Sequence, residues 1–237
     1  MPALALTDYC NLNGIAELCS AAKKYNIKPI LGIEASVTGR SRCEKENAFG
    51  ITLLAMNEEG WQNLNQLALP MVDTKLLQKH SAGLICLSGF AGGEVGHLLT
   101  NEPNAGSKEG YKEAKTVAQW YHEVFGDRYY LELRNHGIES QQALFDQTVA
   151  LGDELAIPTV ATNDIHYLDP GDWKAHDRLL RQKDGGMINA DKDHPIMGNI
   201  LHYFRSTKKM LAAFAGQEAA IGRTGEIADR IEPDICT

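Results

Sequence analysis

The sequence has no C-x-x-C pair, no long apolar run and no excess of positive charge. Its five cysteines are scattered along 237 residues: Cys10, Cys19, Cys43, Cys86 and Cys236. This spacing argues against a structural zinc site or a disulfide framework and predicts reduced thiols. No stretch is long enough to cross a membrane, and Met1–Leu6 lacks the basic start of a signal peptide. We therefore expect a cytoplasmic domain without membrane contact.

Signatures of several large protein classes are also missing. There is no P-loop, no G-x-G-x-x-G and no G-x-S-x-G, so readings as a nucleotide-binding fold or a serine hydrolase lose their main support. The formal net charge of −8 argues against direct binding of nucleic acid by the surface of this chain. What the chain does have is a hydrophobic share of 43% over 237 residues, enough for the core of one large α/β domain. Two small domains are the alternative.

Short β-type runs alternate with longer helical patterns. The predicted strands are Ala3–Thr7, Pro29–Ile33, Ile51–Met56, Leu84–Ser88, Tyr129–Leu133 and Pro158–Ala161. The predicted helices are Leu12–Lys24, Glu58–Leu69, Lys108–Phe125, Ser140–Leu155, Thr207–Phe214 and Gln217–Ile231. This repeated βα order predicts a parallel sheet, either open or closed into a barrel.

Three further segments follow a different pattern. Gly39–Asn47 is expected to be a polar loop, Gly185–Asn199 an irregular loop, and His202–Arg205 a short strand. The first strand begins almost at once, at Ala3, although a strand from the middle of a sheet normally lies deeper in a domain. We therefore expect an element that precedes it to be missing.

The end of the sixth predicted strand carries the most informative pair, Asp164 and His166. In a parallel βα unit, the residues that follow the carboxyl end of a strand face the ligand. A carboxylate oxygen and an imidazole nitrogen can both bind a divalent metal ion. The alternative is that Asp164 caps the next turn and His166 is an ordinary surface residue.

Other predicted strands also end in polar residues, namely Asp8, Glu34 and His136. In an α/β barrel these side chains would converge on one rim and could build a metal centre that hydrolyses phosphate esters. Taken singly, Asp8 can be a helix N-cap, Glu34 a solvated charge and His136 a turn residue. His202 belongs to the irregular part of the chain and carries no spacing signal.

Several segments together resemble a known family. They are Met1–Asp8, Ile27–Gly32, Leu53–Gly60, Phe125–Leu133, Val160–Tyr167 and Glu226–Arg230. The resemblance is to the PHP (polymerase and histidinol phosphatase) domain, in the version at the N-terminus of bacterial DNA polymerase III alpha subunits. It implies a distorted seven-stranded α/β barrel, here lacking its first strand. It also implies a single domain over residues 1–237, with about 207–237 leading toward an absent polymerase region.

The resemblance implies a metal site as well. Intact members of the family hold up to three divalent metal ions, hydrolyse phosphoesters and can act as 3′–5′ proofreading exonucleases. Carried over position by position, the family's first-strand ligands precede this chain. Tyr9, Gly50 and Phe90 stand where the family has further ligands.

What remains of the ligand set is Glu34, Asp164 and His166, with Asp8 beside them. Because metal affinity depends on ligand count and geometry, the resemblance implies a non-catalytic scaffold that binds Mn or Zn weakly and does not polymerise DNA by itself. The alternative is a metal-dependent phosphoesterase or exonuclease. The implied partners are the remainder of the alpha subunit and the proofreading and sliding-clamp components of the replisome, with only indirect contact to DNA.

Overall fold

The computed structural model describes residues 2–39, 48–100, 107–183, 201–233 and 235. Most of the predicted polar loop Gly39–Asn47 and all of the predicted irregular loop Gly185–Asn199 lie outside the described residues.

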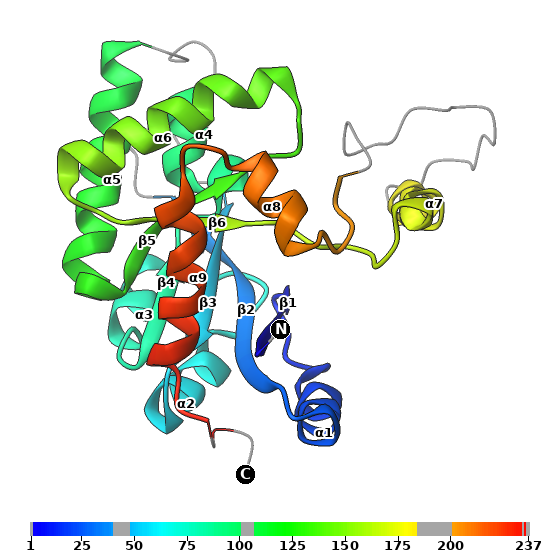
Figure 1. Ribbon diagram of the computed structural model, residues 1–237. Coiled ribbons are helices and arrows are strands. Elements are labelled where there is room, and N and C mark those ends of the chain that lie inside the picture. The colour runs from blue at the N-terminus through cyan, green and yellow to red at the C-terminus, as the bar shows by residue number, and fades with distance from the viewer. Residues whose placement is uncertain (1, 40–47, 101–106, 184–200, 234, 236–237) are drawn as a thin grey trace.

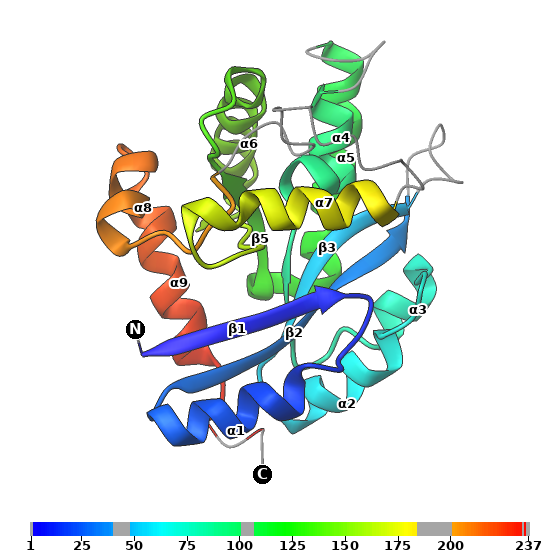
Figure 2. The same cartoon turned by 90° about the vertical axis from the view of Figure 1, so that its right-hand side faces the viewer.

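The described residues form one curled, mixed sheet. Its six strands are β1 (Ala3–Tyr9), β2 (Lys28–Thr38), β3 (Ala48–Ala55), β4 (Leu84–Leu87), β5 (Tyr129–Arg134) and β6 (Thr159–Thr162). They follow one another in the order β1-β2-β3-β4-β5-β6, so β1 and β6 are the two edges of an open half-barrel (Figure 1, Figure 2). The α/β class and the barrel-like sheet are confirmed, and a seventh strand is not among the described residues.

The direction of β3 corrects the prediction of an all-parallel sheet. β3 runs antiparallel to both β2 and β4, whereas β1 pairs with β2, β4 with β5 and β5 with β6 in parallel. Only residues 39–47 separate β2 from β3, and a parallel connection needs a crossover of about a dozen residues or more. The other five strands therefore end at one edge of the sheet, the carboxyl rim, and β3 begins there.

The six predicted helices are present close to the predicted positions. They are α1 (Ile15–Tyr25), α2 (Glu58–Leu67), α5 (Lys108–Phe125), α6 (Gln142–Leu155), α8 (Thr207–Ala213) and α9 (Glu218–Arg230). Three further helices have no predicted counterpart, namely α3 (Thr74–Lys79), α4 (Glu94–Thr100) and α7 (Trp173–Lys183). The side chain of Asn57 accepts the Gly60 N–H at 2.9 Å at the start of α2. Ser107 does the same for Gly110 at 3.0 Å in α5. These caps satisfy backbone donors that a helix leaves unpaired at its start.

The remaining elements are short. The 3₁₀ turns are Phe90–Gly92, Gly126–Arg128, Glu139–Gln141 and Pro170–Asp172. The predicted strand His202–Arg205 is wrong, because that segment makes only a single bridge, between Tyr203 and Tyr167.

A large apolar core lies between the sheet and the helices that cover it. Among its fully buried side chains are Ile33, Leu53, Leu64 and Tyr129, and burying one side chain of this size contributes roughly 1.5–3 kcal/mol.

A second cluster joins α8 and α9 to the far edge of the sheet. Its buried members are Leu133, Ala161, Phe214 and Ala220, and α9 runs alongside β6 (Figure 1). The two last helices therefore pack on the same sheet as the rest of the described chain.

The thiols differ in part from the prediction. Cys10 and Cys86 are free, as expected, but Cys19 is disulfide-bonded, so the prediction of reduced thiols is wrong at this position. Among the described helices, none combines the length and apolar character needed to cross a membrane.

Candidate functional site

Segments that are far apart in the sequence meet around a small cavity at the carboxyl rim. The cavity has a volume of about 170 Å³ and is lined by Phe90, Ala91, Arg134, His136, Gln141, Asp164 and His202. These residues come from the turn after β4, the end of β5 and the loop behind it, the segment after β6, and the extended segment 201–206. Polar and ionisable side chains thus gather where the parallel strands end.

Asp164 is the anionic centre of this cavity. Its φ of 51° lies in the left-handed region, which aspartate tolerates better than most residues but which still marks strain. Its carboxylate lies 3.1 Å from Arg134 Nη1, 3.4 Å from His166 Nε2 and 3.4 Å from His202 Nδ1. Burial alone would raise the pKa of Asp164, but the hydrogen bonds from His166 and His202 and the charge of Arg134 hold it well below its usual range. The carboxylate is therefore ionised at neutral pH.

Arg134 bridges Asp164 to a second, buried carboxylate. Its Nε donates to Glu132 Oε1 at 2.9 Å, and Glu132 is only 2% exposed. Glu132 also accepts from the backbone N–H of Gly89 at 3.1 Å and from the Thr162 hydroxyl at 2.5 Å. Burial lowers the pKa of Arg134, but the charges of Glu132 and Asp164 outweigh that effect and raise it. A fixed guanidinium cation therefore stands between two carboxylates.

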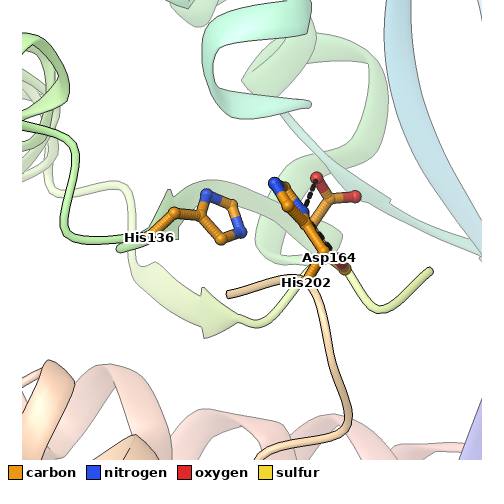
Figure 3. A group of neighbouring side chains, drawn as sticks. All are labelled: His136, Asp164 and His202. Atoms are coloured by element: carbon orange, nitrogen blue, oxygen red, sulfur yellow. Dashed lines mark hydrogen bonds and ion pairs between the residues drawn. The ribbon is translucent and has the colours of Figure 1, made fainter. Parts of the chain in front are cut away.

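Two histidines lie on another side of Asp164. His136 and His202 stack with ring centroids 4.0 Å apart and an interplanar angle of 30°. One potential ligand atom from each of His136, Asp164 and His202 lies within 4.8 Å of the other two (Figure 3). Burial and the neighbouring His202 lower the pKa of His136 to about 4, so this imidazole is neutral at pH 7. The three side chains form the one group of this kind that the described residues contain.

Backbone and side-chain hydrogen bonds hold His202 in this place. The N–H of His166 donates to the His202 carbonyl at 2.9 Å, and the Asn163 amide donates to the Tyr203 carbonyl at 2.6 Å. Arg205 donates to the Asn135 carbonyl at 2.9 Å. Sequence reasoning missed His202, because 38 residues separate it from Asp164 and no local pattern joins them. Glu132 was missed too, although a charged residue within an otherwise apolar strand was a usable signal.

Comparison of the sequence with known proteins shows the family of this chain. The model of the PHP domain matches residues 1–136. The chain belongs to the PHP domain family. It is 36% identical over 254 residues to the DNA polymerase III subunit alpha of Helicobacter pylori, covering 99% of this chain and 21% of that protein. The corresponding subunit of Chlamydia muridarum is 32% identical over 284 residues, with 100% and 22% covered. That of Campylobacter jejuni is 36% identical over 251 residues, with 98% and 21% covered. The chain thus spans about a fifth of the length of these relatives.

The structure brings Glu34, which the sequence analysis expected to be a remnant metal ligand, to the same rim. Glu34 is level with the end of β1 because it pairs with Tyr9. Burial raises the pKa of Glu34, the positive charge of Arg134 lowers it, and the negative charge of Asp164 raises it further, so Glu34 faces the same charged cluster. A Cβ at Gly50 would stand 3.0 Å from Glu34 Oε1. Glu34 nevertheless lies outside the group of close ligand atoms formed by His136, Asp164 and His202.

Asp8 lies elsewhere. Side chains alternate along a strand, so Asp8 and Tyr9 point to opposite faces of β1. The Asp8 carboxylate lies 3.1 Å from the point where a Cβ of Gly14 would stand, at the start of α1. The expectation that Asp8 lies beside Glu34 and Asp164 therefore differs from the structure.

The multinuclear metal cluster that the PHP family implies does not fit these residues. Gly50 and Phe90 offer no donor atom, and the phenol of Tyr9 is a poor ligand while it is protonated. Arg134 already neutralises Asp164. Within the described part of the chain, His136, Asp164 and His202 are the one group of His, Cys, Asp or Glu side chains close enough together to hold a metal ion.

Proposed function

We propose that this chain is the PHP-domain portion of a bacterial replicative DNA polymerase III alpha subunit and that it acts as a non-catalytic scaffold. The observation that carries the proposal is the position of Arg134, 2.9 Å from Glu132 and 3.1 Å from Asp164. Metal-dependent phosphoesterases use divalent ions to activate water and to neutralise the phosphate. A guanidinium supplies positive charge but has no coordination position in which to activate a water molecule.

The same guanidinium opposes the binding of a metal cluster. Two unit charges of like sign about 4 Å apart repel by about 4 kcal/mol at an effective dielectric constant of ~20, and a divalent ion doubles this. Mn or Zn bound by Glu34, Asp164 and His166 would therefore be held weakly.

The relation to the rest of a polymerase subunit follows from the relatives. We propose one domain over residues 1–237, with 207–237 leading toward a polymerase region. The packing of α8 and α9 on β5 and β6 supports this assignment. The remainder of the alpha subunit is the proposed main partner, and proofreading and sliding-clamp components of the replisome are further ones. DNA contact is indirect, and the chain alone has no polymerase activity.

A second candidate function is a metal-dependent phosphoesterase or 3′–5′ exonuclease. The proximity of His136, Asp164 and His202 is the observation that favours it.

Activity measurements separate the two functions. The purified chain is incubated with Mn²⁺ or Zn²⁺ and either p-nitrophenyl phosphate or end-labelled single-stranded DNA. The scaffold proposal expects hydrolysis no faster than in a protein-free control. Robust metal-dependent nucleotide release that is abolished by Asp164→Ala but retained by Asp153→Ala, at an exposed position on α6, would establish the enzyme instead.

A further inference from the structure

We propose that the open edge of β1 pairs with β1 of a second copy of this chain, in antiparallel orientation and centred on Ala5. The sheet then continues from one copy into the other. This inference goes beyond the scaffold function, because it needs neither a metal ion nor the remainder of a polymerase subunit.

The two edges of the sheet are protected differently. At β6, α9 runs alongside the strand (Figure 1), and Arg223 of α9 donates to the Thr159 carbonyl at 2.9 Å. The outer edge of β6 is therefore covered. β1, in contrast, runs along the front of the molecule in Figure 2, and no described helix or strand crosses it there.

The hydrogen bonds to β2 show which backbone groups of β1 point away from the sheet. At one end of the strand, the N–H of Lys28 donates to the Pro2 carbonyl at 2.9 Å. At the other end, the N–H of Cys10 donates to the Glu34 carbonyl, also at 2.9 Å. Because the direction of these groups alternates from residue to residue along a strand, the even-numbered residues of β1 bond to β2. The odd-numbered residues therefore direct their N–H and C=O groups outward.

The outward row consists of Ala3, Ala5 and Thr7. Among the described residues, no other backbone segment bonds to the N–H or C=O groups of these three residues. The row stops at Tyr9, because the Tyr9 carbonyl already accepts Asn11 Nδ2 at 3.0 Å. Unpaired N–H and C=O groups along a strand edge form a template on which another strand can pair.

This outward row is complementary to itself. In an antiparallel pair centred on Ala5, Ala5 stands opposite Ala5 of the second copy, and Ala3 stands opposite Thr7. Each of these is a hydrogen-bonded pair that exchanges two N–H···O bonds, so every outward donor and acceptor of the row finds a partner. On the other face of the strand, Leu4 of one copy lies opposite Leu6 of the other, and such apolar cross-strand pairs stabilise a sheet.

The sequence of β1 lacks the devices that normally prevent edge pairing. Natural edge strands carry lysine, proline or a bulge, or lie under a helix or loop. From Ala3 to Thr7, β1 contains only alanine, leucine and threonine, although 23% of the whole chain is charged. Ala5, at the centre, is exposed. The composition therefore permits pairing along the whole outward row.

The distribution of charge favours the antiparallel pair. Asp8 is the one charged residue of β1. In the pair centred on Ala5, the Asp8 residues of the two copies lie at opposite ends, about 20 Å apart at roughly 3.4 Å per residue, well beyond the Debye length of about 8 Å. A parallel pair in register would place them about 4.8 Å apart. The antiparallel pair also has two-fold symmetry, so it closes after two copies.

Analytical ultracentrifugation of the full chain tests the association. Between about 1 μM and about 1 mM, the range in which small interfaces associate, the mass should rise from 26.0 kDa toward twice that value. Ala5→Lys places two lysines directly opposite each other and should weaken dimerisation at least about tenfold. Ala219→Lys, at an exposed position of α9, is the matched control and should dimerise like the unmodified chain.

Two further measurements test the register. An equimolar mixture of Ala5→Lys and Ala5→Glu should dimerise although each variant alone does not, because opposite charges then face each other. Ala5→Cys should form a disulfide between copies under mild oxidation, since the Cα atoms of a hydrogen-bonded pair lie about 5.5 Å apart. Tyr25→Cys, at an exposed position of α1, controls for random collision, and the unmodified chain controls for the native thiols.

Any of three results would overturn the proposal: a mass of 26.0 kDa at every concentration, equal dimerisation by Ala5→Lys and Ala219→Lys, or cross-linking of Tyr25→Cys as fast as that of Ala5→Cys. If circular dichroism shows that Ala5→Lys does not fold, Ala5→Pro replaces it with the same expectation, because proline there removes only an outward N–H. The scaffold proposal is tested separately, because the mass of the chain does not report on hydrolysis.

Discussion

Replacing Arg134 by methionine tests the charge network on which the scaffold proposal depends. The change keeps most of the side-chain volume but removes the 2.9 Å contact with Glu132 and the 3.1 Å contact with Asp164. It leaves two carboxylates whose side chains are only 3% and 17% exposed. Removing one partner from a buried ion pair costs about 3–5 kcal/mol, because the remaining charge stays buried without compensation. For a domain of this size, that corresponds to a fall in Tm of about 6–20 °C.

Thermal and urea unfolding followed by circular dichroism measure the loss. Lys115→Met is the control, because Lys115 pairs with Glu154 at the surface, where the side chains are 36% and 43% exposed. Its effect should stay within about 1 kcal/mol. The double variant Glu132→Gln/Arg134→Met should recover part of the stability, because the neutral amide needs no cation. The reasoning is refuted if Arg134→Met unfolds at the same temperature and urea concentration as Lys115→Met.

Two further variants probe the rim. Glu34→Gln should increase the free energy of unfolding at pH 7. Burial raises the pKa of Glu34, so the ionised carboxylate destabilises the fold above that pKa. The extra stability of Glu34→Gln over the unmodified chain should therefore shrink as the pH falls into the ordinary carboxyl range. Extra stability that grows toward low pH would contradict this reasoning. Tyr9→His should not create manganese-dependent hydrolysis in the same phosphoesterase assay, because Gly50 and Phe90 still offer no ligand; activity above the unmodified chain would contradict this.

The sequence was sufficient to predict the approximate positions of the six strands of the sheet, because short β-branched runs bounded by turn residues are a strong local signal. The additional strand predicted at His202–Arg205 is only a single bridge. The direction of β3 was not predicted, since periodicity carries no information on strand direction. The length of the connection between β2 and β3 does indicate the direction, because residues 39–47 hold no helical pattern and are too few for a usual crossover.

The candidate site was predictable only in part, for a similar reason. Asp164 lies at the rim because it follows the end of β6, and that strand end could be predicted from the sequence. Glu34 was expected just after a strand but lies within β2, and it reaches the rim because it pairs with Tyr9 at the end of β1. His202 reaches Asp164 only through the pairing of the segment 201–206 with the loop after β6, a contact between distant parts of the chain. Arg134 could be predicted to lie at the end of its strand, but its role as a bridge between Asp164 and Glu132 depends on the buried position of Glu132.

We propose that Arg134 and the missing ligands leave no multinuclear metal site in this PHP domain. Titration of the purified chain with Mn²⁺, with free manganese measured by electron paramagnetic resonance, tests it most directly. The account predicts less than one tightly bound Mn²⁺ per chain at neutral pH. Two or three Mn²⁺ ions bound tightly per chain, and released by Asp164→Ala, would contradict it.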